Sequence, residues 1–101
     1  MITITGTVGA SYLVSGMPVQ TTANGVLKIS FENNTAGTSL SLCAGSMANF
    51  NAGVAGTTLA TSGGPGFIFL TIVDTQQLSG QVIYVLRTKG AGNSQFTINI
   101  E

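Results

Sequence analysis

The sequence lacks most of the side chains that perform chemistry. It contains no histidine and no tryptophan, and its one cysteine is Cys43. Histidine is the usual general base and the commonest metal ligand, so its absence argues against acid–base catalysis and against a cysteine–histidine nucleophile. A lone cysteine also excludes an intramolecular disulfide, which fits assembly in a reducing compartment.

Charge is the second shortage. Only 6% of the 101 residues are charged and the formal net charge is zero, whereas about 25% is usual in globular proteins. The basic residues Lys28, Arg87 and Lys89 are too few to neutralise many phosphates, so no nucleic-acid partner is expected. Interspersed charge normally keeps monomers apart, so either partners cover much of this surface or neutral Ser, Thr, Asn and Gln side chains replace the charge. Of the two we favour a surface covered by partners.

The few remaining reactive groups do not form a catalytic pattern. The carboxylates Glu32, Asp74 and Glu101 fall in different predicted elements, whereas a glycosidase pair must meet across a cleft. Asp74 alone is a poor calcium site, because calcium needs several oxygen ligands. Cys43 lies between apolar residues and is expected to be a small buried side chain. We therefore predict no enzyme, no catalytic residue, no cofactor and no metal site.

Long apolar runs are also missing. No run approaches the roughly 20 residues that a transmembrane helix needs, and the start MITITGTV has neither the charged nor the apolar part of a signal peptide. We expect no membrane association and no secretion.

What is present is two-residue alternation. In residues 2–8, Ile2 and Ile4 alternate with threonines, and in residues 27–32, Leu27, Ile29 and Phe31 alternate with polar side chains. Similar patterns, or short apolar runs, occur at residues 12–14, 39–43, 57–61, 67–73, 81–88 and 96–101. Turn signals separate them, among them an Asn-Gly at 24–25, the polar stretch 33–37 and the Gly-rich stretches 62–66 and 90–93.

Residues 44–66 give the weakest signal, and we predict a long ordered loop with one short strand at 57–61. About seven or eight strands and no significant helix predict a single all-β domain over residues 1–101. The expected form is a two-sheet antiparallel β-sandwich, and eight strands would suit a jelly roll.

The stretch LTIVDTQQLSGQVIYVLR, residues 70–87, has apolar residues on both faces of its two strands. A small sandwich has one interior, so a second covering surface is expected, and other copies of the chain could supply it. Alternation places Phe31, Phe96 and most of the Phe67/Phe69 pair in the core. One of the two sets Phe67/Phe69/Val73 and Ile68/Leu70/Ile72 is expected to face the core and the other to face a neighbour. The predicted oligomer interface consists of Ile68, Leu70, Ile72, Ile83 and Val85. Asp74 and the following Ser79-Gly80 are expected to form a structural connector.

The same part of the chain carries a family resemblance. The residues that match are Thr71, Val73, Asp74, Thr75, Ser79, Gly80, Tyr84, Leu86, Arg87 and Lys89, followed by the closing strand 96–100. This pattern resembles the C-terminal strands of small jelly-roll modules in tailed-bacteriophage virions, which occur in capsid decoration (cement) proteins and in fibre heads and tips. The resemblance covers about the last third of the chain. It implies a homotrimer.

The resemblance and the low charge together predict a virion structural protein. The expected protein is a trimeric capsid decoration protein, made in the host cytoplasm and bound to the major capsid protein on the capsid exterior. One alternative is a carbohydrate- or receptor-binding sandwich such as a tail-fibre tip, with the loop 44–66 and Phe50 as its site. Another is a filament subunit that pairs through the strand at residues 2–8.

Overall fold

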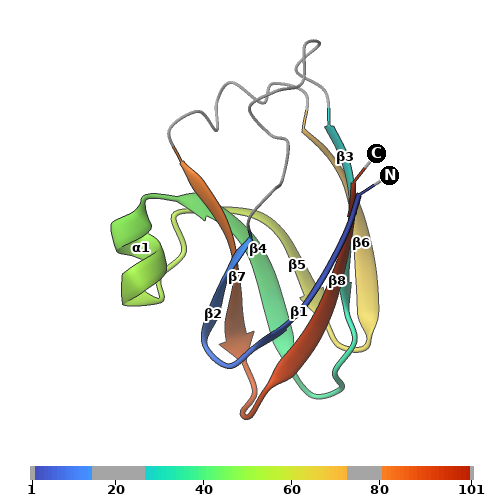
Figure 1. Ribbon diagram of the computed structural model, residues 1–101. Helices are drawn as coiled ribbons and strands as arrows, with labels where there is room; N and C mark the ends of the chain where they lie inside the picture. The colour runs from blue at the N-terminus through green and yellow to red at the C-terminus, as the bar shows by residue number, and fades with distance from the viewer. Residues whose placement is uncertain (1, 15–26, 73–80, 101) are drawn as a thin grey trace.

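The computed structural model describes residues 2–14, 27–72 and 81–100 of the chain. The described residues form eight strands and one short helix, which is α1 (Figure 1). In chain order the elements are β1 Ile2–Val8, β2 Ser11–Val14, β3 Leu27–Asn33, β4 Ser39–Gly45, α1 Met47–Ala52, β5 Thr57–Gly63, β6 Gly66–Ile72, β7 Val82–Lys89 and β8 Ser94–Ile100.

The strands form two four-stranded antiparallel sheets that pack face to face. The first sheet has the order β1-β8-β3-β6 and the second has the order β2-β7-β4-β5. Each of the first four strands therefore pairs with one of the last four, counted back from the end of the chain. The predicted two-sheet sandwich is confirmed, and this strand order fits a jelly roll.

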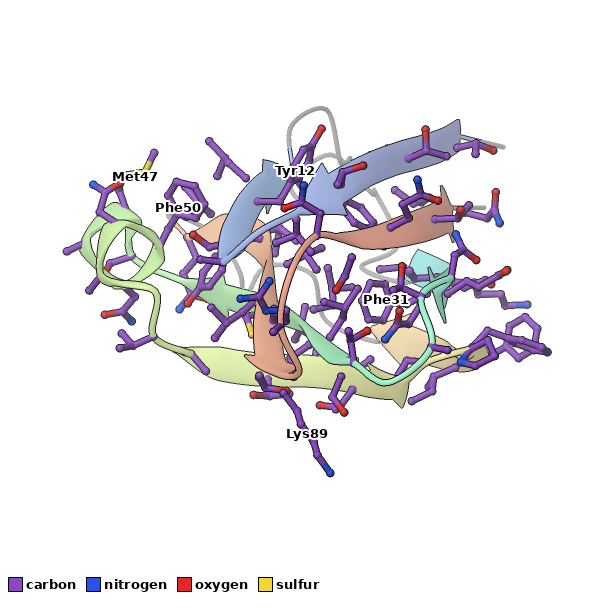
Figure 2. All side chains as sticks on the ribbon, turned by 90° about the horizontal axis from the view of Figure 1, so that it is seen from below. Tyr12, Phe31, Met47, Phe50 and Lys89 are labelled. Carbon is purple, nitrogen blue, oxygen red and sulfur yellow. The ribbon has the colours of Figure 1, made fainter. Side chains whose placement is uncertain are left out.

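The core lies between the sheets and consists of the inward-facing residues of each strand. Along β3, Ile29 and Phe31 are 2% and 0% exposed, while Lys28 on the opposite face is exposed. Figure 2 shows Phe31 in the space between the two sheets. Burial of such side chains contributes about 1.5–3 kcal/mol each, which is the main force that holds the sheets together. The buried cluster comprises Val8, Val14, Ile29, Phe31, Leu40, Leu42, Ala44, Ala60, Ile83, Val85, Phe96, Ile98 and Ile100.

Gly6 allows the largest side chain of β8 to lie under β1. A Cβ atom at Gly6 would stand 2.8 Å from the ring of Phe96 and 3.0 Å from that of Tyr12. These two rings meet edge to face at 5.1 Å between centroids. The break in the Ile2, Ile4, Val8 alternation is therefore a packing requirement.

One short helix, α1, lies within residues 44–66, for which the sequence predicted a long ordered loop with one short strand. Ser46 caps it by accepting a hydrogen bond from the Asn49 amide at 3.1 Å, and Gly53 ends it with a φ of 69°. A serine before and a glycine after the segment are ordinary helix boundary signals. At six residues the helix is too short to show an apolar stripe, so periodicity did not reveal it. The short strand predicted at 57–61 is confirmed and extends to Gly63 as β5.

Several sequence predictions fall outside the described residues. These are the Asn-Gly turn at 24–25, the Asp74 connector with Ser79-Gly80, and the position of Glu101. For Leu70 and Ile72 the structure describes the strand but not the side chains.

Candidate functional site

Over β4 and β7, the outer face of the second sheet is covered by the chain itself. Cys43, Tyr84 and Leu86 point away from the main core and are 0%, 0% and 8% exposed. They form a second buried cluster, with Phe50 of α1 packed against it. The rings of Phe50 and Tyr84 meet edge to face at 5.7 Å between centroids. Figure 2 shows the Phe50 side chain projecting from α1.

Tyr84 fixes the segment that follows α1. Its hydroxyl donates a hydrogen bond to the Val54 carbonyl oxygen at 2.6 Å and accepts one from the Gly56 amide at 3.0 Å. A buried phenol with both its donor and its acceptor capacity used holds a loop in a defined position. The loop and α1 therefore act as a cover over β7.

Cys43 lies under this cover. Burial away from water raises the pKa of its thiol, with a smaller opposing effect from a hydrogen bond to Thr58. The thiolate is the reactive form, so a raised pKa and full burial make this cysteine unreactive. The prediction that Cys43 is a small buried side chain is confirmed.

No segment of residues 2–14, 27–72 and 81–100 covers the outer face of the first sheet, and its side chains form rows across the strands. Cross-strand pairing places Thr5, Thr97, Glu32 and Phe67 in one row from β1 to β6. A second row, level with Phe69, consists of Thr3, Asn99, Ser30 and Phe69. Each row thus begins with neutral polar side chains and ends on an aromatic ring at the β6 edge.

Phe67 and Phe69 are the largest exposed apolar groups of the described residues. They are 60% and 73% exposed, and their rings meet edge to face at 5.2 Å between centroids. This is a correction of the expectation that most of this pair lies in the core. The inward position on β6 belongs to Ile68, which packs against the core cluster.

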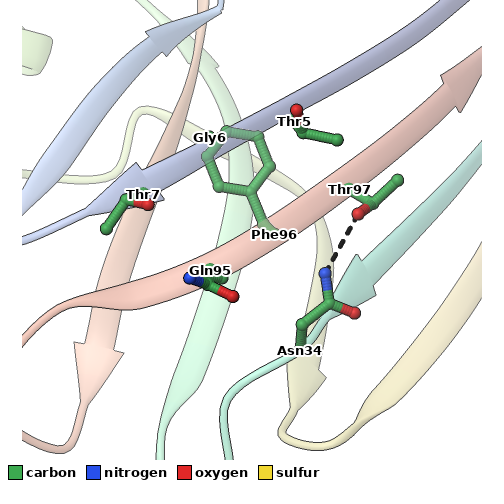
Figure 3. Close-up of a pocket in the computed structure, with 7 residues that line it drawn as sticks. All are labelled: Thr5, Gly6, Thr7, Asn34, Gln95, Phe96 and Thr97. Carbon is green, nitrogen blue, oxygen red and sulfur yellow. Dashed lines mark hydrogen bonds between the residues drawn. The ribbon is translucent and has the colours of Figure 1, made fainter.

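A hollow of about 360 Å³ lies at the other end of the rows, over β1 and β8 (Figure 3). No charged side chain is among its lining residues, which are Thr5, Gly6, Thr7, Asn34, Gln95, Phe96 and Thr97. The side chains of Thr5, Thr7 and Gln95 are exposed. Within the described part of the chain they form no hydrogen bond with another residue.

The turn after β3 fixes the edge of the hollow. The Asn34 side-chain amide donates to the Thr97 hydroxyl at 3.0 Å, and the Asn34 backbone amide donates to the Gln95 carbonyl oxygen at 2.9 Å. The Gln95 amide in turn donates to the Thr35 hydroxyl at 2.9 Å. Asn33 is fully buried and holds the base of this turn, donating to Ser62 O at 3.0 Å and accepting from Thr35 N at 3.0 Å.

The residues that the sequence assigned to an oligomer interface do not form one surface. Ile83 and Val85 are 4% and 0% exposed and belong to the core between the sheets, and Ile68 packs against the same core. This corrects their assignment, because a residue already buried in its own domain has no surface left for a neighbour. Alternation identified two-sided strands but could not tell the inner face from the outer one.

Of the three carboxylates that the sequence analysis considered, the structure describes one, Glu32. Glu32 lies half-buried on the outer face of the first sheet, in the row that ends at Phe67. The described residues contain no group of three or more histidine, cysteine, aspartate or glutamate side chains that could hold a metal ion. The described residues contain no helix that is long and apolar enough to cross a membrane.

The edge strands of the two sheets differ in how well they are protected against pairing with another chain. In the second sheet, β2 is only four residues long, and the pairing of β4 with β5 shifts at Leu42/Cys43. In the first sheet, β1 and β6 are each seven residues long, pair in regular register and contain no charged residue or proline. Short strands, irregularities, charges and prolines are the usual protections, so within the described residues β1 and β6 are the edges that lack them.

No protein-family model matches the chain, and no curated protein matches it.

Proposed function

We propose that the protein is a virion structural protein, a capsid decoration protein that trimerises and binds the assembled head of a tailed bacteriophage. The observation that supports it best is the pair of unprotected edges of the first sheet. A long, regular and uncharged edge strand presents unpaired backbone groups, and such an edge is a template for another strand. In a protein made for permanent assembly, this exposure is useful because a partner covers it.

The directions of the strands fit a closed ring of identical copies. In a four-stranded antiparallel sheet the two edge strands run in opposite directions. The β6 edge of one copy is therefore antiparallel to the β1 edge of a neighbour that is rotated about an axis along the strands. A heterologous contact of this kind makes a ring when the rotation closes, and the homotrimer implied by the family resemblance is such a ring.

The charges are placed where they do not hinder this pairing. Lys28 and Glu32 lie on β3, and Arg87 and Lys89 lie on β7, and both strands are internal to their sheets. On β6, Phe67 and Phe69 would lie beside the threonine side chains of the neighbour's β1. Pairs of aromatic and β-branched side chains on adjacent strands contribute roughly 0.2–1 kcal/mol each.

The function of such a ring is mechanical. A trimer that contacts several copies of the major capsid protein adds contact free energy to the shell and opposes its expansion. The low charge of the chain suits contacts of this kind, because permanent interfaces resemble a protein core more than an ordinary surface.

The first test is the mass of the protein in solution. Light scattering at micromolar concentration should give three times the chain mass of 10.2 kDa. Phe69→Lys places a charge on the β6 edge and should give a monomer, whereas Thr57→Lys on the β5 edge should leave the trimer intact. A wild-type protein that is strictly monomeric would exclude the β1–β6 ring.

The second test is the composition of the virus particle. Mass spectrometry of purified particles from a host that carries this gene should find the protein at a copy number that is a multiple of three. Its absence from such particles would overturn the capsid role even if the trimer forms.

A further inference from the structure

We propose that the outer face of the first sheet binds a neutral oligosaccharide, which lies across the strands from the hollow over β1 and β8 to Phe67 and Phe69. The inference concerns a face of the sheet, whereas the trimer proposed above uses its edges. Pairing between edges leaves the face accessible, but Phe67 and Phe69 contribute side chains to both proposals. The mass in solution tests the trimer and ligand titration tests the sugar site, so the failure of one is distinguishable from the failure of the other.

The lining of the hollow defines the class of ligand. Threonine hydroxyls and the Asn34 and Gln95 side chains can each donate and accept hydrogen bonds, as sugar hydroxyls do. A phosphate or sulfate group would call for arginine or lysine, and neither lines the hollow. An apolar ligand would call for an apolar lining. A neutral, hydroxyl-rich molecule fits this set of side chains.

The hollow is already formed without a ligand. The turn that bears Asn34 is held to β8 by three hydrogen bonds of 2.9–3.0 Å, and Asn33 anchors it from below. A site that needs no rearrangement loses less free energy on binding. Thr5, Thr7 and Gln95 then offer hydrogen-bonding groups that no described residue uses. The volume of about 360 Å³ is within the range of small-ligand sites, which starts near 300 Å³.

The two phenylalanines supply the apolar part of the site. The ring face of an aromatic side chain carries partial negative charge and attracts the weakly positive C–H groups of a sugar ring. Phe67 is in the same row as Thr5, Thr97 and Glu32. Neighbouring strands lie about 4.8 Å apart, so the row spans roughly 14 Å from β1 to β6. That is room for a chain of a few sugar units, with one unit in the hollow and another on the aromatic pair.

Glu32 adds a charge preference. It lies midway along the row between Thr97 and Phe67 and is the one charged residue of that row. A carboxylate accepts hydrogen bonds from sugar hydroxyls but repels acidic sugars. The row should therefore prefer neutral chains over uronic-acid chains, because Lys28, the exposed cation on the same face, lies four residues along β3 from Glu32.

Nuclear magnetic resonance titration of the full chain tests the site. The probes are the neutral maltotetraose, cellotetraose, chitotetraose and mannotetraose, with tetragalacturonate as the acidic comparison. We expect at least one neutral probe to bind with a Kd on the order of 0.1–1 mM and to shift the amide signals of the row residues. No shift by any neutral probe at about 10 mM would overturn the proposal, as would tighter binding of tetragalacturonate.

Substitutions of exposed residues locate the binding. Gln95→Ala and Thr5→Val should each weaken binding of the neutral probe about tenfold, and Phe67→Ala about three- to tenfold, while Phe67→Tyr should retain it. Thr57→Val is the matched control, because it makes the same change at an exposed strand position of the other sheet. Equal weakening by Thr57→Val, or unchanged binding in Gln95→Ala and Phe67→Ala, would place the ligand elsewhere and refute this site.

Discussion

The outer faces of the two sheets differ in whether their aromatic side chains are buried or exposed. Each carries aromatic residues that point away from the central core. On the second sheet Tyr84 is 0% exposed, because α1 and the loop after it pack over β7. On the first sheet Phe69 is 73% exposed and no described residue covers it. An apolar outer face in a small sandwich is therefore weak evidence for a partner by itself, since the chain can cover it.

The difference between the two faces also indicates which residues stabilise the fold and which are available for recognition. On the covered part of the second sheet, the Tyr84 hydroxyl and the Cys43 thiol are buried and their contacts lie within the chain. The open face has regular polar rows, a preformed hollow and two exposed rings, which contribute little to the fold of one chain. Residues on the open face are thus the candidates for recognition, and residues on the covered face are the candidates for large effects on stability.

The largest expected difference comes from removing one aromatic side chain from each face. Tyr84→Ala should lower the free energy of unfolding by about 3–5 kcal/mol, because it empties a buried site and leaves the Val54 and Gly56 backbone groups without their partner. Phe69→Ala should change it by no more than about 0.5 kcal/mol in the monomer. Chemical denaturation of both variants measures the difference.

Comparable losses from the two variants at low protein concentration would contradict this division of the faces. A loss for Phe69→Ala that appears only as the concentration rises would instead place the ring in an interface between copies.

A smaller effect should follow from adding one methyl group under the cover. A Cβ at Gly56 would stand 2.5 Å from the Ala44 carbonyl oxygen and 2.9 Å from the Gly45 Cα, both of which are backbone atoms. Gly56→Ala should therefore cost about 1–3 kcal/mol, because the loop must move off the sheet. At Gly63 an added Cβ meets nothing within 4 Å, so Gly63→Ala is the control and should be nearly neutral. Amide hydrogen exchange at residues 54–56 should accelerate only in Gly56→Ala.

The smallest effect concerns Cys43 and is confined to alkaline pH. Burial raises the pKa of its thiol, so the folded protein keeps a proton that the unfolded chain releases above the ordinary thiol pKa of about 8.5. The stability of the wild type relative to Cys43→Ala should be constant below about pH 8 and should fall as the pH rises further. Denaturation curves across this range measure it. A difference that grows with pH would mean that the thiolate is stabilised and that the cover does not exclude water.

Much of the fold follows from local patterns in the sequence. The alternation of Leu27, Ile29 and Phe31 with polar residues predicts β3, and its inward side is confirmed for Ile29 and Phe31. The turns at 33–37 and 90–93 separate strands as predicted. Such features depend on residues that are close in sequence, and backbone preferences at short range are enough to specify them.

The errors arose where the burial of a side chain depends on distant segments. Ile83 and Val85 have the same apolar character as Val82 and Tyr84, but the first two lie between the sheets and the others lie under α1. No local pattern distinguishes the two sides of β7, because the distinction depends on where the helix packs. For β6 the two faces could not be distinguished either. Phe67 and Phe69 were therefore predicted to be buried and Ile68 to lie in the interface, whereas the structure shows the reverse.

The hollow over β1 and β8 could not be predicted from the sequence either. Its residues come from positions 5–7, 34 and 95–97, and sequence reasoning placed the only room for a site in the loop 44–66. The signals that point to it are the Thr-x-Thr repeat of β1 and the polar positions of β8, which become one surface only when the ends of the chain pair.

By itself the sequence determined the all-β class, the positions of the strands, the shortage of reactive groups and the low charge. These depend on composition and on a two-residue period, which any strand shows before it has partners. The tertiary structure decided which apolar face is the interior, which edges remain unprotected and which polar residues share a row. Those properties depend on sheet order and register, and both are set by contacts between segments far apart in the chain.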